Sequence, residues 1–478
     1  MRKTQTKKEN RKHKNFRRLV LLLPLLWLAA CNRQAQPQGS ETGLRPDLTD
    51  KFETIKNLGL RQEKAYDFLK MITSTGGRLT GSPEADRAVQ ITFDLMRELS
   101  FDRVWTEPVK VRRWIRGPAE EAVVRSSKDG NKTLAICALG NSVATPPEGI
   151  EARVVEVQSF EDLASKKDKI PGCIVFFNVP MDRATVESFS AYGQTARFRV
   201  RGASEAARYG ARAAIIRSMT FRLDDNPHTG LLEYDDSLPK IPAAAVSTLG
   251  AESLHSLLQS DPELRLRLKL NCREEEEVTS ANVIGQLTGS ELSEEIILVG
   301  GHLDSWDLSP GAHDDAAGCA VAVEALRLIK EAGLKPRRTV RAVLFMDEEF
   351  GGTGGRAYAV RPEREQEKHL VAIEQDRGGA APVGLAFSLE SLKEKLKPLE
   401  IWLKPLGINW VRTGGGGVDI APLKERGAVL GALIPESHRY FDYHHSALDV
   451  PEAVSPRELE LQAVILAMVI YYLAEEGV

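Results

Sequence analysis

The chain has 478 residues, too many for one ordinary hydrophobic core, so we expect two folded domains. Hydrophobic residues make up 42% and charged residues 27% of the chain, an ordinary balance for a globular protein. The formal net charge is -3, but residues 1–30 hold nine basic residues and one acid, and without them 55 basic and 66 acidic residues remain. This acidic remainder gives no electrostatic reason to expect nucleic acid as a partner.

The N-terminal 30 residues have the pattern of a signal peptide. A basic stretch is followed by an apolar run over residues 19–30, which is shorter than the about 20 apolar residues that span a bilayer. The run ends Leu-Ala-Ala-Cys at Cys31 and resembles a bacterial lipobox, in which this cysteine carries the lipid. The alternative is a plain signal peptide followed by a chance cysteine. Residues 31–50 are expected to form a tether, and the protein is expected to be exported and lipid-anchored in a bacterial cell envelope, on its periplasmic or extracellular face.

The first folded segment is predicted to be helical, and the segment after it forms a strand. Apolar residues recur at helical spacing over residues 52–99, interrupted by the glycine-rich residues 76–82. Pro83 then stands where a first helical residue is favoured. Residues 104–114 alternate as a strand does.

The middle of the chain, residues 140–272, has a different character and is predicted to be a separate inserted domain. Short strands are expected at residues 173–177, 213–217 and 264–270, with one helical stretch at 203–209. The polar residues Asp224, His228 and Asp235 are loosely spaced and indicate a solvated loop. The acidic run 274–277 is expected to be an exposed junction.

From residue 280 onward strands alternate with helices, which predicts a mainly parallel sheet covered by helices on both faces. Strands are expected at 296–300, 339–346 and 370–375, and helices at 315–330 and from Ser455 to residue 473. Ser455, Pro456 and Glu458 fit a capping box at the start of the last helix. In such sheets chemistry collects at the carboxyl ends of the strands.

Each of these strand ends is followed by side chains that can bind a metal. Taken alone, a histidine two residues before an aspartate is usually a polar contact, and adjacent glutamates are usually solvated. Here, however, the glutamates follow an apolar strand, an expensive place for unpaired charges. Imidazole and carboxylate ligands together suit zinc or a similar divalent ion. The side chains, in chain order, are His302, Asp304, Asp314, Asp315, Glu348, Glu349, Asp376, His444 and His445.

These motifs, in this order, resemble those of the M28 family of zinc aminopeptidases, and most of all its carboxypeptidase Q-like branch, also called plasma glutamate carboxypeptidase-like. The likeness includes residues 76–82, 302–307 and 440–446 and covers nearly everything after the tether. It implies a zinc aminopeptidase-like α/β domain formed by residues 51–139 and 273–478. Residues 140–272 resemble a smaller β-rich α/β protease-associated domain inserted into it.

The resemblance also implies a role for each site residue. His302, Asp314 and Asp376 would hold one metal ion, and Asp314, Glu349 and His445 a second one, with both ions expected to be Zn²⁺. Glu348 would be the general base, Asp304 would orient His302, and His444 would line the substrate cleft. Asp314 is preferred over Asp315 because Asp315 begins a helix, where an acid has a structural role. His445 is preferred over His444 because its spacing to Asp449 matches the family, although Val450 replaces the usual threonine.

The implied activity is co-catalytic hydrolysis of short peptides by a water held between the two metals. Aminopeptidase or dipeptidase action is expected, and carboxypeptidase specificity stays open. Two other classes share the fold: a glutaminyl cyclase-type acyl transferase, and a non-catalytic binding protein. The full set of ligands argues against both. A homodimer is possible, and the preferred peptide, the native metal and any disulfide pairing among the four remaining cysteines are not determined by the sequence.

Overall fold

The computed structural model of the protein describes residues 46–478. The predicted signal peptide, the lipidation site Cys31 and the tether up to residue 45 lie outside the described residues. Helix α1 (Pro46–Gln62) starts at a proline and buries Leu48 and Phe52, so residues 46–50 belong to this helix and not to a tether. Over residues 46–478, no helix combines the length and the hydrophobicity needed to cross a bilayer.

The first of two sheets carries the residues predicted to bind metal. Its four central strands β12, β11, β13 and β16 run parallel, as the alternation of strands and helices predicted, and the pairs β1–β10, β10–β12 and β14–β16 are antiparallel. The strand order is β1 (Arg103–Ile115), β10 (Arg273–Leu287), β12 (Arg338–Phe345), β11 (Leu292–His302), β13 (Lys368–Glu374), β16 (Val429–Pro435), β14 (Pro382–Phe387) and β15 (Trp410–Thr413).

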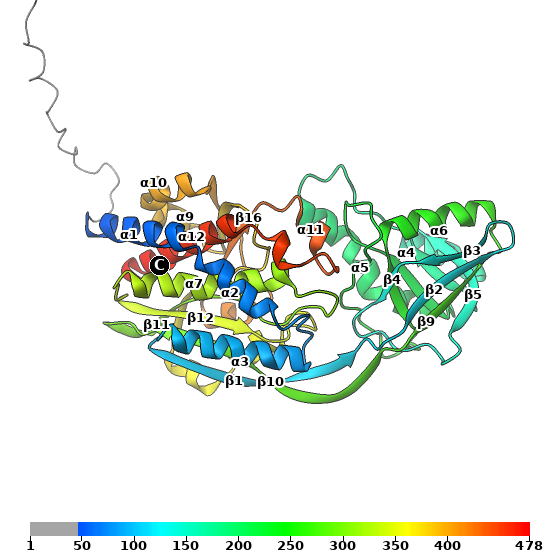
Figure 1. Ribbon diagram of the computed structural model, residues 1–478, viewed down its shortest axis with the longest axis horizontal. Helices are drawn as coiled ribbons and strands as arrows, with labels where there is room; N and C mark the ends of the chain where they lie inside the picture. The colour runs from blue at the N-terminus through cyan, green and yellow to red at the C-terminus, as the bar shows by residue number, and fades with distance from the viewer. Residues whose placement is uncertain (1–45) are drawn as a thin grey trace, which may run out of the picture. The chain divides into compact units, whose positions relative to one another are not determined.

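Helices cover this sheet because its central strands are apolar on both faces. Along β11, Ile297 and Val299 join the core under α7 (Ala317–Glu331) and α12 (Pro456–Glu476), while Ile296 and Leu298 join a second cluster on the opposite face. Helices α1 and α2 (Lys64–Thr73) pack on α7 and α12, and α3 (Pro83–Glu98) packs on β1 and β10 (Figure 1). The short helix α8 (Thr353–Ala359) also contacts β1 and β10.

Helix starts fall where capping residues predicted them. Ser455 accepts a hydrogen bond from the Glu458 backbone N–H at 3.4 Å, with Pro456 as the first helical residue of α12. Ser82 accepts one from the Ala85 N–H at 3.1 Å, which begins α3 at a proline. Both caps satisfy backbone donors that a helix start leaves free.

A second eight-stranded sheet is formed by residues 120–270. Its order is β3 (Gly130–Leu134), β2 (Glu120–Ser126), β9 (Arg265–Leu270), β5 (Ile150–Val157), β6 (Ile174–Phe177), β7 (Ala213–Arg217), β8 (Ala243–Val246) and β4 (Ile136–Ala138). The predicted insert, residues 140–272, contains β5 to β9, and β2 to β4 precede it. The acidic run 274–277 is largely exposed, as predicted, but lies within strand β10.

Helices α4 (Phe160–Ser165), α5 (Ser188–Ala207) and α6 (Thr248–Ser260) connect strands of this sheet and lie beside it (Figure 1). Helix α5 is much longer than the predicted stretch at 203–209. Its buried positions recur at helical spacing, but they include Ser188, Thr195 and Arg199, so hydrophobic periodicity alone did not reveal it.

The four cysteines of the described residues, Cys137, Cys173, Cys272 and Cys319, are buried free thiols. This confirms the prediction of buried thiols for Cys173 and Cys319.

Candidate metal centre

The predicted ligands come from the carboxyl ends of neighbouring parallel strands. His302 ends β11, Glu349 follows β12, and Asp376 follows β13. Asp314 lies in the loop before α7, and His445 follows the short helix α11 (Tyr440–Tyr443) after β16. Because parallel strands end at one edge of the sheet, residues far apart in the sequence meet there.

The structure brings all five predicted ligands together. The two carboxylate oxygens of Asp314 face different histidines: Oδ1 is 3.1 Å from His302 Nε2, and Oδ2 is 3.2 Å from His445 Nε2. His445 Nε2 also lies 3.1 Å from Glu349 Oε2, and His302 Nε2 lies 3.6 Å from Asp376 Oδ1. Asp314 therefore stands between two groups of donor atoms.

The neighbouring Asp315 is fully buried and has different partners. Its Oδ2 accepts the backbone N–H of His302 at 3.0 Å, and its Oδ1 accepts that of Gly318 at 2.9 Å. Asp315 is also close enough to His302 and Asp376 to form a possible donor group with them. Its two backbone contacts favour a structural role, and the position of Asp314 between two histidines favours Asp314 as the shared ligand.

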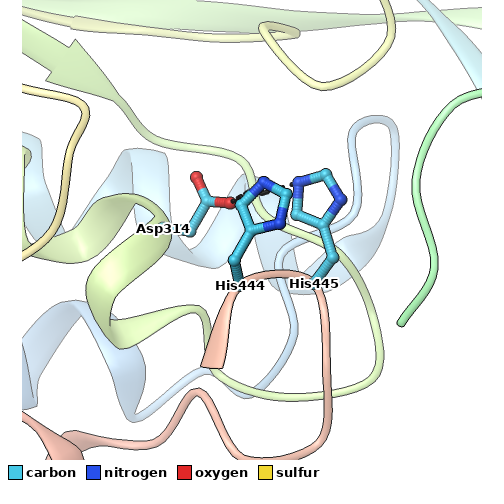
Figure 2. A group of neighbouring side chains, drawn as sticks. All are labelled: Asp314, His444 and His445. Atoms are coloured by element: carbon cyan, nitrogen blue, oxygen red, sulfur yellow. Dashed lines mark ion pairs between the residues drawn. The ribbon is translucent and has the colours of Figure 1, made fainter. Parts of the chain in front are cut away.

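The two adjacent histidines lie side by side next to Asp314. Figure 2 shows both imidazole rings beside the aspartate, and the rings stack with centroids 3.5 Å apart. His444 Nε2 is 3.6 Å from Asp314 Oδ2, farther than the corresponding atom of His445, and no Glu349 contact accompanies it. The ring of His444 instead packs among Tyr192, Tyr440 and Phe441.

The charges of this cluster depend on one another because most of its members are buried, with Glu348 and Asp376 half-buried. Burial alone would raise the pKa of Asp314, but hydrogen bonds with His302 and His445 hold it well below its ordinary value. Burial lowers the pKa of His445, but the carboxylates of Glu349 and Asp314 raise it to about 9. Burial and nearby carboxylates raise the pKa of Glu348 well above its ordinary value. A low pKa suits the shared carboxylate ligand, and a raised pKa makes the Glu348 carboxylate a stronger proton acceptor, so the two groups suit different roles.

The partners of Asp304 differ from a simple contact between its carboxylate and the histidine. His302 Nδ1 lies 3.0 Å from the backbone oxygen of Asp304 and 3.8 Å from its Oδ1. The carboxylate accepts backbone N–H groups of Asp347 at 2.8 Å and Glu348 at 3.1 Å. Asp304 thus holds both His302 and the start of the loop after β12, which carries Glu348.

Several supporting residues were not assigned from the sequence. Arg78, in the glycine-rich segment 76–82, is fully buried and donates to the backbone oxygens of Leu303, Pro310 and Gly311. Trp306 Nε1 donates to Glu349 Oε2 at 2.5 Å. Tryptophan and arginine are not themselves metal ligands, so a search of the sequence for ligand types does not find them.

The second sheet also contributes a loop to the site, through residues 228 and 229. Thr229 N–H donates to the His445 backbone oxygen at 2.9 Å, and His445 Nδ1 lies 3.3 Å from the Thr229 oxygen. His228 Nδ1 lies 2.7 Å from the His444 backbone oxygen. The prediction that His228 belongs to a solvated loop is wrong, because this side chain is only 4% exposed. Loosely spaced polar residues did not reveal this contact, which depends on the tertiary structure.

The residues fit a divalent metal ion. Histidine and carboxylate are the donor types that zinc accepts. Glu349 Oε1 is buried and has no hydrogen-bond partner among residues 46–478, so it is free to bind a cation. His445 and Asp347 have φ angles of 60° and 76°, a left-handed conformation that costs about 1–3 kcal/mol for such residues and occurs at functional sites.

Comparison with known proteins agrees with this geometry. The sequence model of peptidase family M28 matches residues 282–470 of the chain. Human carboxypeptidase Q is 35% identical over 431 residues, which cover 89% of each chain. The solved structure of a peptidase M28 precursor from Shewanella amazonensis superposes with a TM-score of 0.85 at 33% identity, covering 90% of this chain and 98% of that one. A zinc aminopeptidase from Bacillus subtilis shares the fold, with a TM-score of 0.62 at 20% identity over 87% of this chain and 95% of that one. The chain therefore belongs to peptidase family M28, as its motifs predicted, and is a metallo-exopeptidase.

Proposed function

We propose that the protein hydrolyses short peptides and that two divalent metal ions act together at this centre. Zinc is the ion that we propose for both positions. The observation that carries the proposal is the position of Asp314, whose Oδ1 and Oδ2 lie 3.1 Å and 3.2 Å from the Nε2 atoms of His302 and His445. A carboxylate with one oxygen toward each donor group suits the ligand shared by two cations. Asp376 completes the first donor group, and Glu349 the second.

When bound, the two ions would polarise the scissile carbonyl and lower the pKa of the attacking water. Glu348 acts as the general base: its carboxylate takes a proton from this water as the water oxygen bonds to the carbonyl carbon. Glu348 then gives the proton to the peptide nitrogen as the C–N bond breaks. Among residues 46–478, Glu348 forms hydrogen bonds only through its backbone atoms. Its carboxylate forms none with these residues, so it is available for this transfer. Asp304 positions Glu348 by accepting its backbone N–H at 3.1 Å.

Exchange of the base tests the mechanism. Glu348→Gln keeps the size of the side chain but cannot take a proton, so kcat should fall by about 10²–10⁴-fold. The content of bound metal, measured by elemental analysis, should stay that of the wild type. Glu365→Gln changes an exposed glutamate and serves as the matched control. Full turnover of Glu348→Gln would refute the assignment of the base.

Removal of the shared ligand tests the number of ions. Asp314→Ala should reduce bound zinc from two ions per chain to one or none, whereas Asp376→Ala and Glu349→Ala should each weaken mainly one ion. Titration of metal-stripped protein with zinc, followed by calorimetry, separates two sites from one. A wild-type stoichiometry of one ion would overturn the two-ion mechanism and leave a single-metal hydrolase.

Two further features of the sequence enter this proposal. We infer that residues 140–272, with the strands that precede them, form a protease-associated domain, and that Thr229 and His228 of this domain help to hold the loop of His445.

We also infer export and attachment of a lipid at Cys31. Cys31→Ser should move the protein from the membrane fraction to the soluble fraction of the cell envelope, and an unchanged distribution would argue for a plain signal peptide.

A further inference from the structure

A small cavity lies beside the loops that carry two of the predicted metal ligands. Its volume is about 160 Å³, well below the about 300–1,000 Å³ of pockets that hold drug-sized molecules. Two of its lining residues are chain neighbours of predicted ligands: His313 precedes Asp314, and Arg377 follows Asp376. The other walls come from the loop after β13, from helix α11 and from the start of α12.

The charged side chains of this cavity are not paired with one another. Two arginines and two glutamates line it: Arg377, Arg439, Glu436 and Glu458. Among residues 46–478, neither arginine has a carboxylate within ion-pair distance, and Glu458 has no cation within that distance. Glu436 has only the exposed His438, at 3.7 Å. Positive and negative groups therefore border one small space without neutralising one another directly.

Both arginines keep free hydrogen-bond donors. The Arg377 guanidinium lies over the ring of Phe189, 4.4 Å from its centroid, and none of its N–H groups finds an acceptor in the described part of the chain. The Arg439 guanidinium donates to the Tyr443 hydroxyl and lies 5.4 Å from the centroid of that ring. A guanidinium has five N–H donors in a planar fork that matches a carboxylate. The aromatic contacts hold the two side chains in place and leave most of these donors unused.

The uncharged walls offer little competition for a polar ligand. His313 Nδ1 accepts the Gly379 N–H at 3.1 Å, and its Nε2 lies 3.2 Å from the Ala453 backbone oxygen. Both ring nitrogens are thus engaged within the protein. The other uncharged wall residues are alanines and tyrosines: Ala380, Ala381, Ala453, Tyr440 and Tyr443. They suit a small aliphatic group, and the polar contacts of a ligand fall to the four charged side chains.

Size and charge together match a free amino acid. A cavity of about 150 Å³ holds a molecule of the size of benzene, and alanine has the same number of non-hydrogen atoms. Its carboxylate suits the two guanidinium groups, and its ammonium group suits the two glutamates. We propose that this cavity binds a small free α-amino acid as an effector, separately from the peptide at the metal centre. The binding itself is independent of the proposed function, whereas the source of the ligand, hydrolysis of short peptides, rests on it.

The position of the cavity connects it to the metal centre. A bound amino acid would contact Arg377, one residue from Asp376, and would lie against His313, one residue from Asp314. Both loops carry ligands of the proposed first ion. Occupancy of the cavity therefore acts on the centre through these loops, and a product of hydrolysis can regulate the reaction without occupying the place of the substrate.

Calorimetry of the zinc-loaded protein tests the site with three molecules of nearly equal size. Alanine carries both charges, L-lactate lacks the ammonium group, and alaninamide lacks the carboxylate. Alanine should bind at least tenfold more tightly than either of the others, because each lacks one set of charge-assisted hydrogen bonds. L-lactate that binds as tightly as alanine would reveal a simple anion site and overturn the proposal.

Variants locate the bound alanine. Arg439→Met and Glu458→Gln should each weaken it about 10- to 100-fold. The matched controls are Arg457→Met, an exposed arginine that pairs with Glu63, and Glu452→Gln, an exposed glutamate near the start of α12; both should bind alanine as the wild type does. Unchanged affinity in Arg439→Met and Glu458→Gln would place alanine elsewhere and refute the site.

Kinetics tests the coupling. Alanine should lower kcat for leucyl-leucine, a peptide that releases no alanine, and this effect should disappear in Arg439→Met and Glu458→Gln. Purely competitive inhibition that persists in both variants would assign alanine to the metal centre and overturn the effector role.

The two proposals can fail separately. If the metal-replete protein cleaves no peptide of a broad panel, the proposed function fails, while calorimetry still decides the cavity. If it cleaves peptides but alanine does not bind, the peptidase stands and the amino-acid site is refuted.

Discussion

Arg78 offers the sharpest test of how the metal centre is held in place. Its guanidinium donates to the backbone oxygens of Leu303 at 2.7 Å, Gly311 at 3.1 Å and Pro310. Leu303 follows the predicted ligand His302, and Gly311 begins the loop that carries the shared ligand Asp314. Arg78→Met would keep the apolar stem and remove all three hydrogen bonds.

The expected magnitude follows from these contacts. A hydrogen bond to a charged group contributes about 1.5–3 kcal/mol, so the three together contribute about 4.5–9 kcal/mol. Relief from burying the guanidinium offsets several kcal/mol of this. We expect Arg78→Met to lower the free energy of unfolding by about 2–4 kcal/mol, and zinc affinity to fall about 10- to 100-fold because two ligand-bearing loops lose their common support.

Urea unfolding of the metal-stripped protein measures the first effect, and competition with a chromogenic chelator measures the second. Arg87→Met removes an exposed arginine paired with Glu84 and should change stability by less than about 1 kcal/mol. Unchanged zinc affinity in a destabilised Arg78→Met protein would show that Arg78 supports the fold alone. Unchanged stability and affinity would refute the reasoning altogether.

Three further outcomes are expected. Burial and the neighbouring Glu324 raise the pKa of Glu460 from 4.5 to about 9, so its neutral form contributes stability that is complete below about pH 4.5 and is lost as the pH rises through about 9. E460Q should flatten this part of the urea-unfolding profile, and an unchanged slope between pH 6 and 9 would contradict the assignment. Chelation should lower the thermal midpoint, and zinc at 100 times its Kd should restore about 2.7 kcal/mol for each ion that binds; a midpoint indifferent to zinc would exclude binding to the folded state. W306F removes the donor to Glu349 Oε2 and should weaken zinc about tenfold, as the chelator competition would show.

Much of the fold was predictable because it depends on local patterns. The strand ending at His302 and the helix beginning at Ser455 are marked by hydrophobic spacing and capping residues, which act within a few positions of the chain. Most of helix α5 and strands β2 to β4 were not predicted. The buried face of α5 mixes polar and apolar residues, and the three strands are short and bury few side chains, so both depend on the second sheet.

By itself, the sequence determined the family, the alternation that builds a parallel sheet, and the five side chains that meet at its edge, because strand ends carry their residues to a common place. Only the tertiary structure decided the supports of that centre: Arg78, which donates to the backbone of two ligand-bearing loops, and the contact of Thr229 with His445. These depend on segments brought together from distant parts of the chain, and a buried arginine, threonine or tyrosine carries no local mark of the group it will meet.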